Sequence, residues 1–485
     1  MEKVKLKKLV EKPISGEWGD EDTLGDGINI IRTTNFSKSG IIDYSNLTRR
    51  LIQKKNKKGE LEIDVEKIES KKLIDEDIII EKSGGGPNSP VGRVVYFEGK
   101  DDQLYLCNNF TAILRPKKNL INARYLFYQF SYLYLIGKVK KYQNQTTGLF
   151  NLKLPRYLDV EIKIPNKEQQ VLVVAQLNKI QELINERKET IVLLDDYKLS
   201  LFLEMFLENP ESNKWEFKVI SKTKIFESTQ YGTALKANDE GNGMPVLRMN
   251  NITYSGKISL DNIKWVEFSD TEKEKLELND RDVLFNRTNS PKLVGKTGVW
   301  AEGNGYTFAG YLIRIVLNES LMNPYYFSGY FNSHYGKKVL ANKARPSGSM
   351  SNLSATTLRK QKILIPPINL QIKYEVESNK ISLQKHKYEE SLIFLERLFQ
   401  AKLHNAFSEN ADINEDKIFE DLIKDFTIND LKKGERIEYL LSWLKKNKFS
   451  NIENYETAIE KLLHLLEDGT IKQYISKNNI KIKKG

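Results

Sequence analysis

The chain has 485 residues, 40% of them hydrophobic, and a formal net charge of +11. This hydrophobic content suffices for real cores over two to four domains, which excludes a disordered chain. A single cysteine, Cys107, excludes an intramolecular disulfide framework, and no apolar run approaches the roughly 18–20 residues of a membrane helix. The N-terminus lacks the apolar core of a signal peptide, so a cytoplasmic protein is expected. The basic balance favours a polyanionic partner.

The N-terminal part of the chain, 1–165, is predicted to form a mixed globule of strands and helices. Glycine-containing turns separate the strand-like runs, which lie at residues 28–32, 78–81, 92–97 and 110–114. One helix is expected over 122–136, where Asn122 is a suitable N-cap in front of a run rich in Tyr and Leu.

A long helix is predicted to follow Ile164-Pro165, because the residue before a proline is extended and Asn166–Lys167 can start a helix. Roughly 40 helical residues would make a rod of about 60 Å. Its apolar residues recur at heptad spacing, which is typical of a coiled coil: Val173, Leu177, Ile180, Ile184, Ile191, Leu194, Leu201 and Met205. Arg187 and Lys198 interrupt this seam.

This organisation occurs twice. Ile365–Gln371 repeats the opening Ile164–Gln170, and a second long helix is expected behind it. Residues 209–365 also match the first globule, where an Arg-x-x-Asn block at 248–251 answers the block at 32–35 with a larger offset than that of the openings. The smaller offset near the helices indicates that the copies differ in the loops ahead of them. Variable loops on a fixed scaffold suit two sites that recognise different targets.

Residues 408–485 have no upstream copy and are predicted to be a charged, helical extension with a basic end. The sequence therefore divides into a first globule (1–165), a first long helix (166–208), a second globule (209–365), a second long helix (366–407) and the extension (408–485).

Several stretches imitate catalytic or metal-binding motifs but lack essential residues. Val294–Thr297 resembles the end of a phosphate-binding loop, yet Ser290 stands where the first glycine belongs. Asn323–Tyr326 resembles a methyltransferase loop without its second proline, and Glu161 has no acidic counterpart in the second copy. The four histidines have no metal-ligand spacing. Neither a catalytic residue nor a metal site is therefore predicted.

Polar, basic loops rich in glycine occur at matching places in the two copies. Arg, Lys, Asn, Gln, Ser and Thr pair with base edges and phosphates, and glycine lets the backbone approach a phosphate closely. These loops lie at residues 32–35, 82–89 and 138–151 of the first copy and at 248–251, 286–292 and 337–352 of the second. Their recurrence favours DNA as the polyanion.

In the order of its motifs the chain resembles the specificity subunits of type I restriction–modification systems. The residues that carry the resemblance are the two Ile-Pro openings, the Arg-x-x-Asn blocks, the Asn-Leu pairs at 151–152 and 352–353, and the helix ends at 197–202 and 397–402. The resemblance covers roughly 1–407; the 408–485 tail departs from the common pattern.

The resemblance implies an α/β (α+β) fold with two target recognition domains in tandem, separated and followed by long helices that form an antiparallel coiled coil. Each domain would read one half of an asymmetric, bipartite site in double-stranded DNA, and the helices would set the spacing. This subunit would carry no catalytic centre. Two methylation subunits using S-adenosylmethionine would dock on it, and restriction subunits using ATP and Mg²⁺ would join them.

The DNA-contacting candidates follow from the loops. They are Arg32, Asn35, Lys82, Asn88, Arg93, Lys141 and Thr147 in the first domain, and Arg248, Asn251, Arg287, Asn289, Lys292, Lys296, Arg345 and Ser347 in the second. Arg and Asn are expected to read bases, and Lys to hold phosphates.

Two other functions remain open from the sequence. One is a stand-alone nuclease or methyltransferase that dimerises through its helices, which activity of the purified chain with Mg²⁺ or S-adenosylmethionine would reveal. The other is a protein–protein scaffold whose basic loops are merely solvated; salt-sensitive DNA binding would argue against it.

Overall fold

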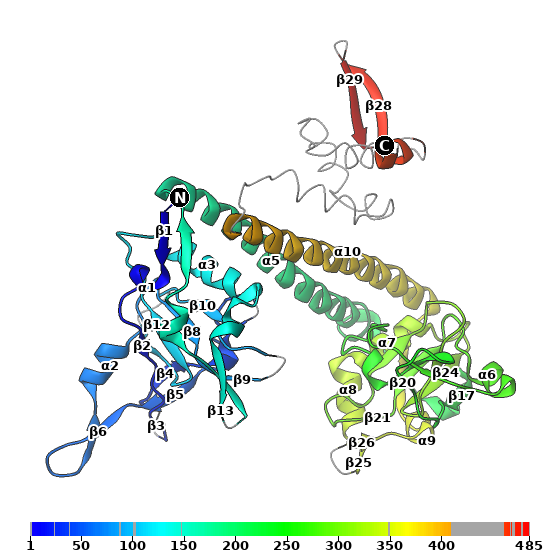
Figure 1. Ribbon diagram of the computed structural model, residues 1–485. Coiled ribbons are helices and arrows are strands. Elements are labelled where there is room, and N and C mark those ends of the chain that lie inside the picture. Colours follow the sequence, from blue (N-terminus) through cyan, green and yellow to red (C-terminus); the bar gives the residue numbers. More distant parts are fainter. Residues whose placement is uncertain are drawn as a thin grey trace. The chain divides into compact units, whose positions relative to one another are not determined.

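Figure 1 shows the computed structural model. The structure describes residues 2–408, with gaps at 24, 38, 87–88, 100–102, 147 and 348–349, and residues 460–484, with gaps at 466, 468–470 and 477–478. The chain forms two compact units: unit 1 comprises 1–185 and 393–485, and unit 2 comprises 186–392. Each long helix therefore belongs to both units.

Unit 1 begins with a mixed globule of strands and short helices. Its elements are β1 (Glu2–Lys5), α1 (Leu6–Leu9), β2 (Ile14–Ser15), β3 (Asp20–Glu21), β4 (Ile28–Ile31), β5 (Thr48–Leu51), β6 (Gln53–Lys55), β7 (Leu61–Ile63), α2 (Val65–Lys71), β8 (Ile78–Glu81), β9 (Ser83–Gly85), β10 (Val94–Tyr96), β11 (Tyr105–Cys107), β12 (Thr111–Leu114), α3 (Ala123–Leu135), β13 (Gln143–Thr146), β14 (Leu149–Leu152), α4 (Leu154–Tyr157) and β15 (Glu161–Ile164). The strands and the helix expected near 28, 78, 94, 111 and 122 are confirmed.

Unit 2 contains a globule of the same kind. Its elements are β16 (Glu216–Val219), β17 (Phe226–Tyr231), β18 (Met244–Leu247), β19 (Lys264–Val266), α6 (Asp270–Leu276), β20 (Val283–Asn286), β21 (Thr288–Asn289), β22 (Thr297–Val299), β23 (Thr307–Phe308), β24 (Leu312–Leu317), α7 (Pro324–Asn332), α8 (His334–Ala341), β25 (Arg345–Ser347), β26 (Met350–Asn352), α9 (Ala355–Arg359) and β27 (Lys362–Ile365).

The sheets of the two units match one another strand by strand. The antiparallel sheet β10–β8–β12–β2 of unit 1 corresponds to β22–β20–β24–β17 of unit 2. The parallel pair β4–β11 corresponds to β18–β23, and the small sheet β9–β14–β13 corresponds to β21–β26–β25. The mixed helix-and-strand fold is thus confirmed, and the sequence repeat appears as a repeated strand order.

One helix packs on the main sheet of each unit and closes its core. In unit 1, Leu126 and Phe130 of α3 lie fully buried in one cluster with Ile78 and Ile80 of β8. In unit 2, the aromatic residues of α7 fill the corresponding place: Tyr326, Phe327, Tyr330 and Phe331. Consecutive aliphatic residues in the central strands are expected where both faces of a sheet are covered.

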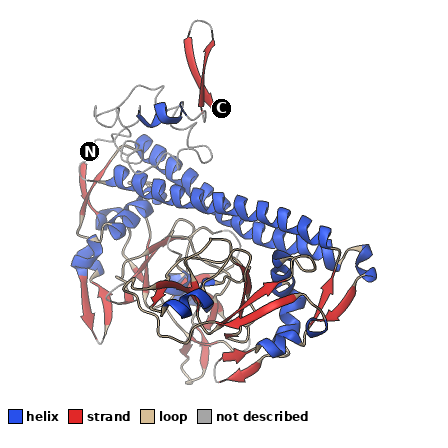
Figure 2. Ribbon diagram, turned by 90° about the vertical axis from the view of Figure 1, so that its right-hand side faces the viewer, coloured by secondary structure: helices blue, strands red, loops and turns tan. Residues whose placement is uncertain are grey.

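The two long helices are α5 (Lys167–Phe202) and α10 (Ile368–Phe407), and both views show them side by side (Figure 1, Figure 2). In unit 2 the ring centroids of Phe202 and Tyr374 lie 5.4 Å apart, and Asp195 forms an ion pair with Lys385 at 2.5 Å. Residue numbers rise on α5 as they fall on α10, so the helices are antiparallel there. In unit 1, Leu177 shares a core with residues near the end of α10.

Polar residues at the seam find partners on the facing helix. The Arg187 guanidinium lies 4.4 Å from the ring centroid of Tyr388, and the Lys198 ammonium donates to the Ser382 hydroxyl at 3.2 Å. Burial lowers the pKa of Lys198. A polar contact in an otherwise apolar seam favours one register, because a shifted pairing leaves the buried group without its partner.

A buried glutamine joins the start of each long helix to its globule. The Gln170 side chain accepts a hydrogen bond from the backbone N–H of Asn122 at 2.9 Å and donates to the carbonyl of Pro165 at 3.0 Å. Gln371 does the same in unit 2, with the N–H of Asn323 at 2.8 Å and the carbonyl of Pro366 at 2.8 Å. This bridge, termed the glutamine clamp, explains why both Ile-Pro openings end in glutamine.

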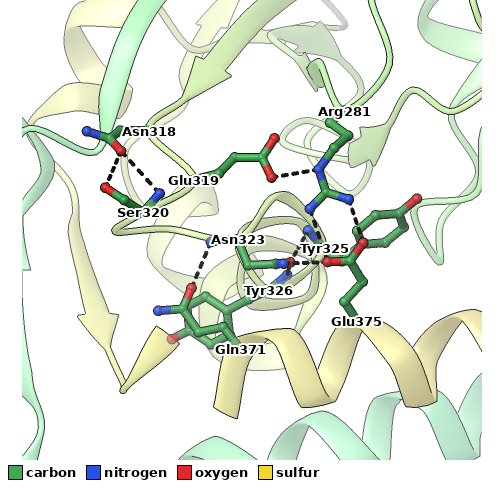
Figure 3. Close-up of polar contacts among 9 residues, drawn as sticks. All are labelled: Arg281, Asn318, Glu319, Ser320, Asn323, Tyr325, Tyr326, Gln371 and Glu375. Atoms are coloured by element: carbon green, nitrogen blue, oxygen red, sulfur yellow. Dashed lines mark hydrogen bonds and ion pairs between the residues drawn. The ribbon is translucent and has the colours of Figure 1, made fainter. Parts of the chain in front are cut away.

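Unit 2 adds an ion-pair network at this junction (Figure 3). Arg281 holds Glu375 of α10 through two hydrogen bonds of 2.6 and 3.0 Å, and its Nε donates to Glu319 at 2.6 Å. Burial alone would raise the pKa of Glu375, but the hydrogen bonds from Arg281 and Asn323 bring it below its usual value. The network therefore fixes α10 against the loops ahead of α7.

The same junction in unit 1 carries a pair of opposite polarity. Glu76 occupies the place of Arg281, with φ of 74° against 73°, and it pairs with Lys118, the counterpart of Glu319 in the repeat. Val174 is the counterpart of Glu375. The interaction is kept while its charges are exchanged, so geometry and not residue identity is common to both copies.

The tail, predicted as a helical extension over 408–485, ends in two strands in its described part. Residues 460–465 are helical, but β28 (Ile471–Ser476) and β29 (Asn479–Lys484) pair as an antiparallel hairpin. The alternation of Ile and Lys that begins at Ile480 has the two-residue period of a strand. This signal is missed when the stretch is considered only for its positive charge. Within the described residues no helix is long and apolar enough to cross a membrane.

We predict that Gln170→Ala and Gln371→Ala each lower the free energy of unfolding by about 1–3 kcal/mol, because a buried N–H and a carbonyl lose their partner. Chemical denaturation monitored by circular dichroism measures this. Gln169→Ala is the matched control, since this neighbouring side chain is exposed. Equal stability of all three variants would contradict a clamp.

Candidate nucleic-acid interface

The Arg-x-x-Asn blocks form the same hydrogen-bonded loop in both units. In unit 1 the Asn35 side chain accepts from the N–H of Arg32 at 2.9 Å and donates to the carbonyls of Asp43 and Asn46. The Arg32 guanidinium donates to the same Asn46 carbonyl at 3.0 Å. Asn35 is only 2% exposed. Its side chain is therefore committed to closing the loop.

Unit 2 repeats this arrangement closely. Asn251 is also 2% exposed, accepts from the N–H of Arg248 at 2.9 Å, and donates to the carbonyls of Ser259 and Asp261. The Arg248 guanidinium donates to the carbonyl of Asn262 at 2.6 Å. Both blocks thus position the loops and keep their Asn side chains away from solvent.

The candidates Arg93 and Lys296 likewise form hydrogen bonds inside their own units. Arg93 donates to Glu81 at 3.0 Å and to the carbonyl of Thr33 at 3.3 Å, and the hydrogen bond to Glu81 raises its pKa. Lys296 is 7% exposed, donates to the carbonyl of Met249 at 3.0 Å, and has a pKa lowered by burial. Because Met249 is the counterpart of Thr33 in the repeat, both cations support the same loop carbonyl.

A different pair of cations, Lys82 and Arg287, lies at a corner where the small sheet begins. The N–H of Leu152 donates to the carbonyl of Lys82 at 2.7 Å, and that of Leu353 donates to the carbonyl of Arg287 at 2.8 Å. A hydroxyl on the next residue, Ser83 or Thr288, donates to the Asn of the Asn-Leu pair at 2.6 Å in both units. The backbone of this recognition corner is therefore the same in the two copies.

The side chains at the two recognition corners differ. The Lys82 ammonium donates to the Ser15 hydroxyl at 3.2 Å, and burial lowers its pKa. The Arg287 guanidinium lies 5.0 Å from the ring centroid of Tyr231 and donates to the carbonyl of Gly310 at 3.3 Å. Both cations are half-buried, with their charge held beside a polar or aromatic neighbour.

The structure brings the predicted loops together within each unit. In unit 1, β9 and β13 flank β14, so the loops at 82–89 and 138–151 meet in one sheet. In unit 2, β21 and β25 flank β26, which joins the loops at 286–292 and 337–352. These small sheets and the recognition corners form the candidate interface.

The remaining candidates occupy several environments. Lys141 and Lys292 are exposed, whereas Asn289 is 7% exposed and accepts from the N–H of Ser290 at 2.8 Å. Arg345 and Ser347 belong to β25. The candidates Asn88 and Thr147 lie outside the described residues.

Sequence reasoning missed Ser15 and Tyr231, the neighbours of the two cations. A signal was present, because Gly16 and Gly232 follow them at the same offset as the two Arg-x-x-Asn blocks. A Cβ on Gly16 would lie 2.0 Å from the carbonyl oxygen of Asn108, and one on Gly232 would lie 2.3 Å from that of Phe308. Only glycine permits these close backbone approaches.

The described residues contain no group of three or more His, Cys, Asp and Glu that could hold a metal ion. Cys107 is buried, which raises the pKa of its thiol to about 11. A protonated, buried thiol behaves as an apolar core residue.

Comparisons with known proteins find relatives of one kind. Residues 1–193 match the model of the Type I restriction modification DNA specificity domain. The chain is 24% identical over 322 residues to the Type I restriction enzyme EcoKI specificity subunit of Escherichia coli K12, covering 62% of this chain and 67% of that protein. A second relative is a Methanocaldococcus jannaschii protein provisionally named the type I restriction enzyme MjaX specificity subunit. The two are 27% identical over 186 residues, which are 37% of this chain and 42% of the relative. The S subunit structure from M. genitalium aligns with a TM-score of 0.48 at 14% identity, over 84% and 96% of the two chains.

These findings point to one class of protein, the DNA-recognition subunits of restriction–modification systems. The resemblance noted in the sequence is confirmed: the chain is similar to the specificity subunits of type I restriction–modification systems, and residues 1–193 match their DNA specificity domain.

We predict that Asn251→Ala lowers the free energy of unfolding by about 2–4 kcal/mol, because it leaves one N–H and two carbonyls without their partner. Asn250→Ala, at the exposed neighbouring position, should change it by less than about 0.5 kcal/mol. Urea denaturation checks both. A stable Asn251→Ala chain that fails only in DNA binding would instead make Asn251 a reading residue.

Proposed function

We propose that each unit reads one half of a bipartite, asymmetric DNA site and that α5 and α10 set the spacing between the halves. The observation that carries the proposal is the pair of recognition corners: matching backbone hydrogen bonds present Lys82 beside Ser15 in one copy and Arg287 beside Tyr231 in the other. A fixed frame with different cations suits two half-sites of different sequence.

The proposed division of labour follows the exposure of the side chains. Arg287 is suited to base reading, since a guanidinium can pair with two acceptors of guanine at once, and Arg345 and Ser347 of β25 would assist it. Lys141 and Lys292, which are exposed, would hold phosphates. For Asn88 and Thr147 the contact to DNA remains as the sequence predicts it. The positioning residues would be those whose polar atoms are used internally: Asn35, Arg93, Asn251 and Lys296.

The chain itself would not catalyse a reaction. Methylation subunits using S-adenosylmethionine would dock on it, and restriction subunits using ATP and Mg²⁺ would complete the complex in the cytoplasm. Support comes from the specificity subunits to which the chain is similar and from the lack of complete catalytic motifs in the sequence. A stand-alone nuclease or methyltransferase is not favoured by these relatives.

Co-expression with a methylation subunit, followed by single-molecule mapping of modified adenines in the host DNA, tests the proposal. A split motif with a constant gap is expected. Modification at continuous or unrelated sites would contradict two reading units. Methyl transfer by the purified chain alone would restore the enzyme alternative.

Arg287→Ala should relax specificity at one half of the mapped motif and leave the other half unchanged, and Lys82→Ala should do the reverse. Each well-made contact of an arginine to a base is worth about 1–3 kcal/mol of discrimination. Competition binding with duplexes mutated in one half-site at a time measures this. An equal reduction in affinity for every duplex would assign either residue to the DNA backbone.

Lys141→Ala should weaken binding to all sequences alike and reduce the slope of log K against log salt by about 0.9, the value for one phosphate contact. Fluorescence anisotropy between low and moderate salt gives this slope. Lys167→Ala, an exposed lysine on α5, is the control and should leave the slope unchanged. An unaltered slope for Lys141→Ala would remove it from the interface.

A further inference from the structure

Unit 1 carries a two-stranded arm that has no counterpart among the described residues of unit 2. The arm consists of β6, β7 and the turn between them, residues 53–63. Asn56 orders the turn: its N–H donates to the carbonyl of Glu60, and its side chain accepts from the N–H groups of Lys58 and Glu60. Gly59 closes the turn with φ of 81°. The tip thus has a defined conformation.

Four of the five residues at 54–58 are lysines, and all four are exposed. Lys54 lies 3.7 Å from Asp64, a long contact at which little of the charge is neutralised. The other three lysines have no ion pair among the residues that the structure describes. Like charges so close together repel one another, and a bound polyanion would relieve that repulsion.

The second copy provides an internal comparison. In unit 1 the stretch between the matched residues Asn46 and Leu73 carries nine Lys or Arg against five Asp or Glu. The matched stretch of unit 2, 263–277, is shorter and carries three Lys against five Asp or Glu. It contains α6, the counterpart of α2, with no arm ahead of it. The arm and its charge are therefore not needed to build the common scaffold.

The arm is directed like the reading loops of its own unit. In Figure 1 its tip and the β13–β14 hairpin of the candidate interface both extend toward the lower edge of unit 1, away from α5. Lysine ammonium groups are compact point charges that suit phosphate oxygens, and phosphate contacts position a protein on a duplex without reading its sequence.

We infer that this arm binds the DNA sugar-phosphate backbone next to the half-site read by unit 1, through Lys54, Lys55, Lys57 and Lys58. The inference rests on the proposed function, because it requires unit 1 to engage a half-site. Binding of the arm makes the contact with DNA asymmetric, because unit 1 then has arm-to-phosphate contacts that unit 2 does not have.

A protein partner is the competing occupant. Leu61 and Ile63 of β7 and Val65 behind it are exposed by 62%, 46% and 61%, and such side chains often lie at protein contacts. The charge at the tip favours DNA. Glu62 lies opposite Lys54 in the ladder and Glu60 accepts from Asn56, but neither forms an ion pair with an arm lysine among the described residues, and Lys55, Lys57 and Lys58 remain in excess. The experiment separates the two.

The test uses the chain purified with its methylation subunits and a duplex that carries the mapped split motif. Replacing the four arm lysines by glutamine should lower the slope of log K against log salt by about 0.9 for each phosphate that is no longer neutralised, so by about 3–4, with unchanged sequence preference. Replacing the four by arginine keeps the charge and should preserve the slope. Lys273→Gln with Lys275→Gln on α6 is the matched control and should change nothing.

Phosphate-ethylation interference on the same duplex gives the location. In the glutamine variant, interference should disappear only on the side of the half-site that Lys82→Ala affects. An unchanged slope, or a change spread over both halves, would overturn the inference, as would dissociation of the methylation subunits with an unchanged slope, which would identify a protein contact. If the unaltered complex recognises no split motif, the proposed function fails; if it does and the arm variant binds equally well, only the arm inference fails.

Discussion

The glutamine clamp at the start of each long helix is the contact on which the rest of the structure depends. Gln170 and Gln371 each use both ends of one amide, the oxygen for the N–H of a helix N-cap residue and the nitrogen for the carbonyl of the Ile-Pro opening. The long helix, the Ile-Pro segment ahead of it and the N-terminus of the helix that packs on the sheet thereby meet at one buried side chain. A shorter or charged side chain cannot satisfy both groups, and buried backbone groups without partners are costly.

The clamp also explains how two copies with little sequence identity keep the same form. What is common to them is a set of hydrogen bonds to backbone atoms: the clamp, the Arg-x-x-Asn loop and the Leu N–H at the recognition corner. Side-chain partners can change together around this backbone frame. Glu76 with Lys118 becomes Arg281 with Glu319. The ion pair of Glu81 with Arg93 is replaced by Asn286 and Lys296, which both donate to the Met249 carbonyl.

Periodicity and repetition were enough to predict the elements, because both follow from which faces must be buried. The strands at β4, β8, β10 and β12, the helix α3 and both long helices lie where the sequence indicated. The prediction for the end of the tail was wrong, because its high charge masks the alternation of Ile with Lys.

The candidate site was harder to predict, because residue type does not show whether a polar side chain faces water or the backbone. Asn35, Asn251 and Lys296 are suited to DNA by their chemistry, yet each is held by carbonyls of its own unit. That outcome depends on the path of loops such as 43–46 and 259–262, which no pattern in the sequence specifies. The Ser15 and Tyr231 positions could have been found from their glycine neighbours, since the Arg-x-x-Asn blocks already define the offset.

On the proposed function, the recognition corners would let a new specificity arise with little cost to the fold. The backbone around them uses the N–H and the carbonyl of residue 82 or 287, which every residue type except proline has. The side chain at that position takes no part in the backbone hydrogen bonds of the corner or in the clamp, so Lys can stand in one copy and Arg in the other. Its neighbour, Ser15 or Tyr231, is constrained only through the following glycine. On the proposed function, stability and target choice would therefore reside in different atoms of the same few residues, which would allow the two units to diverge in what they read while keeping the same structure.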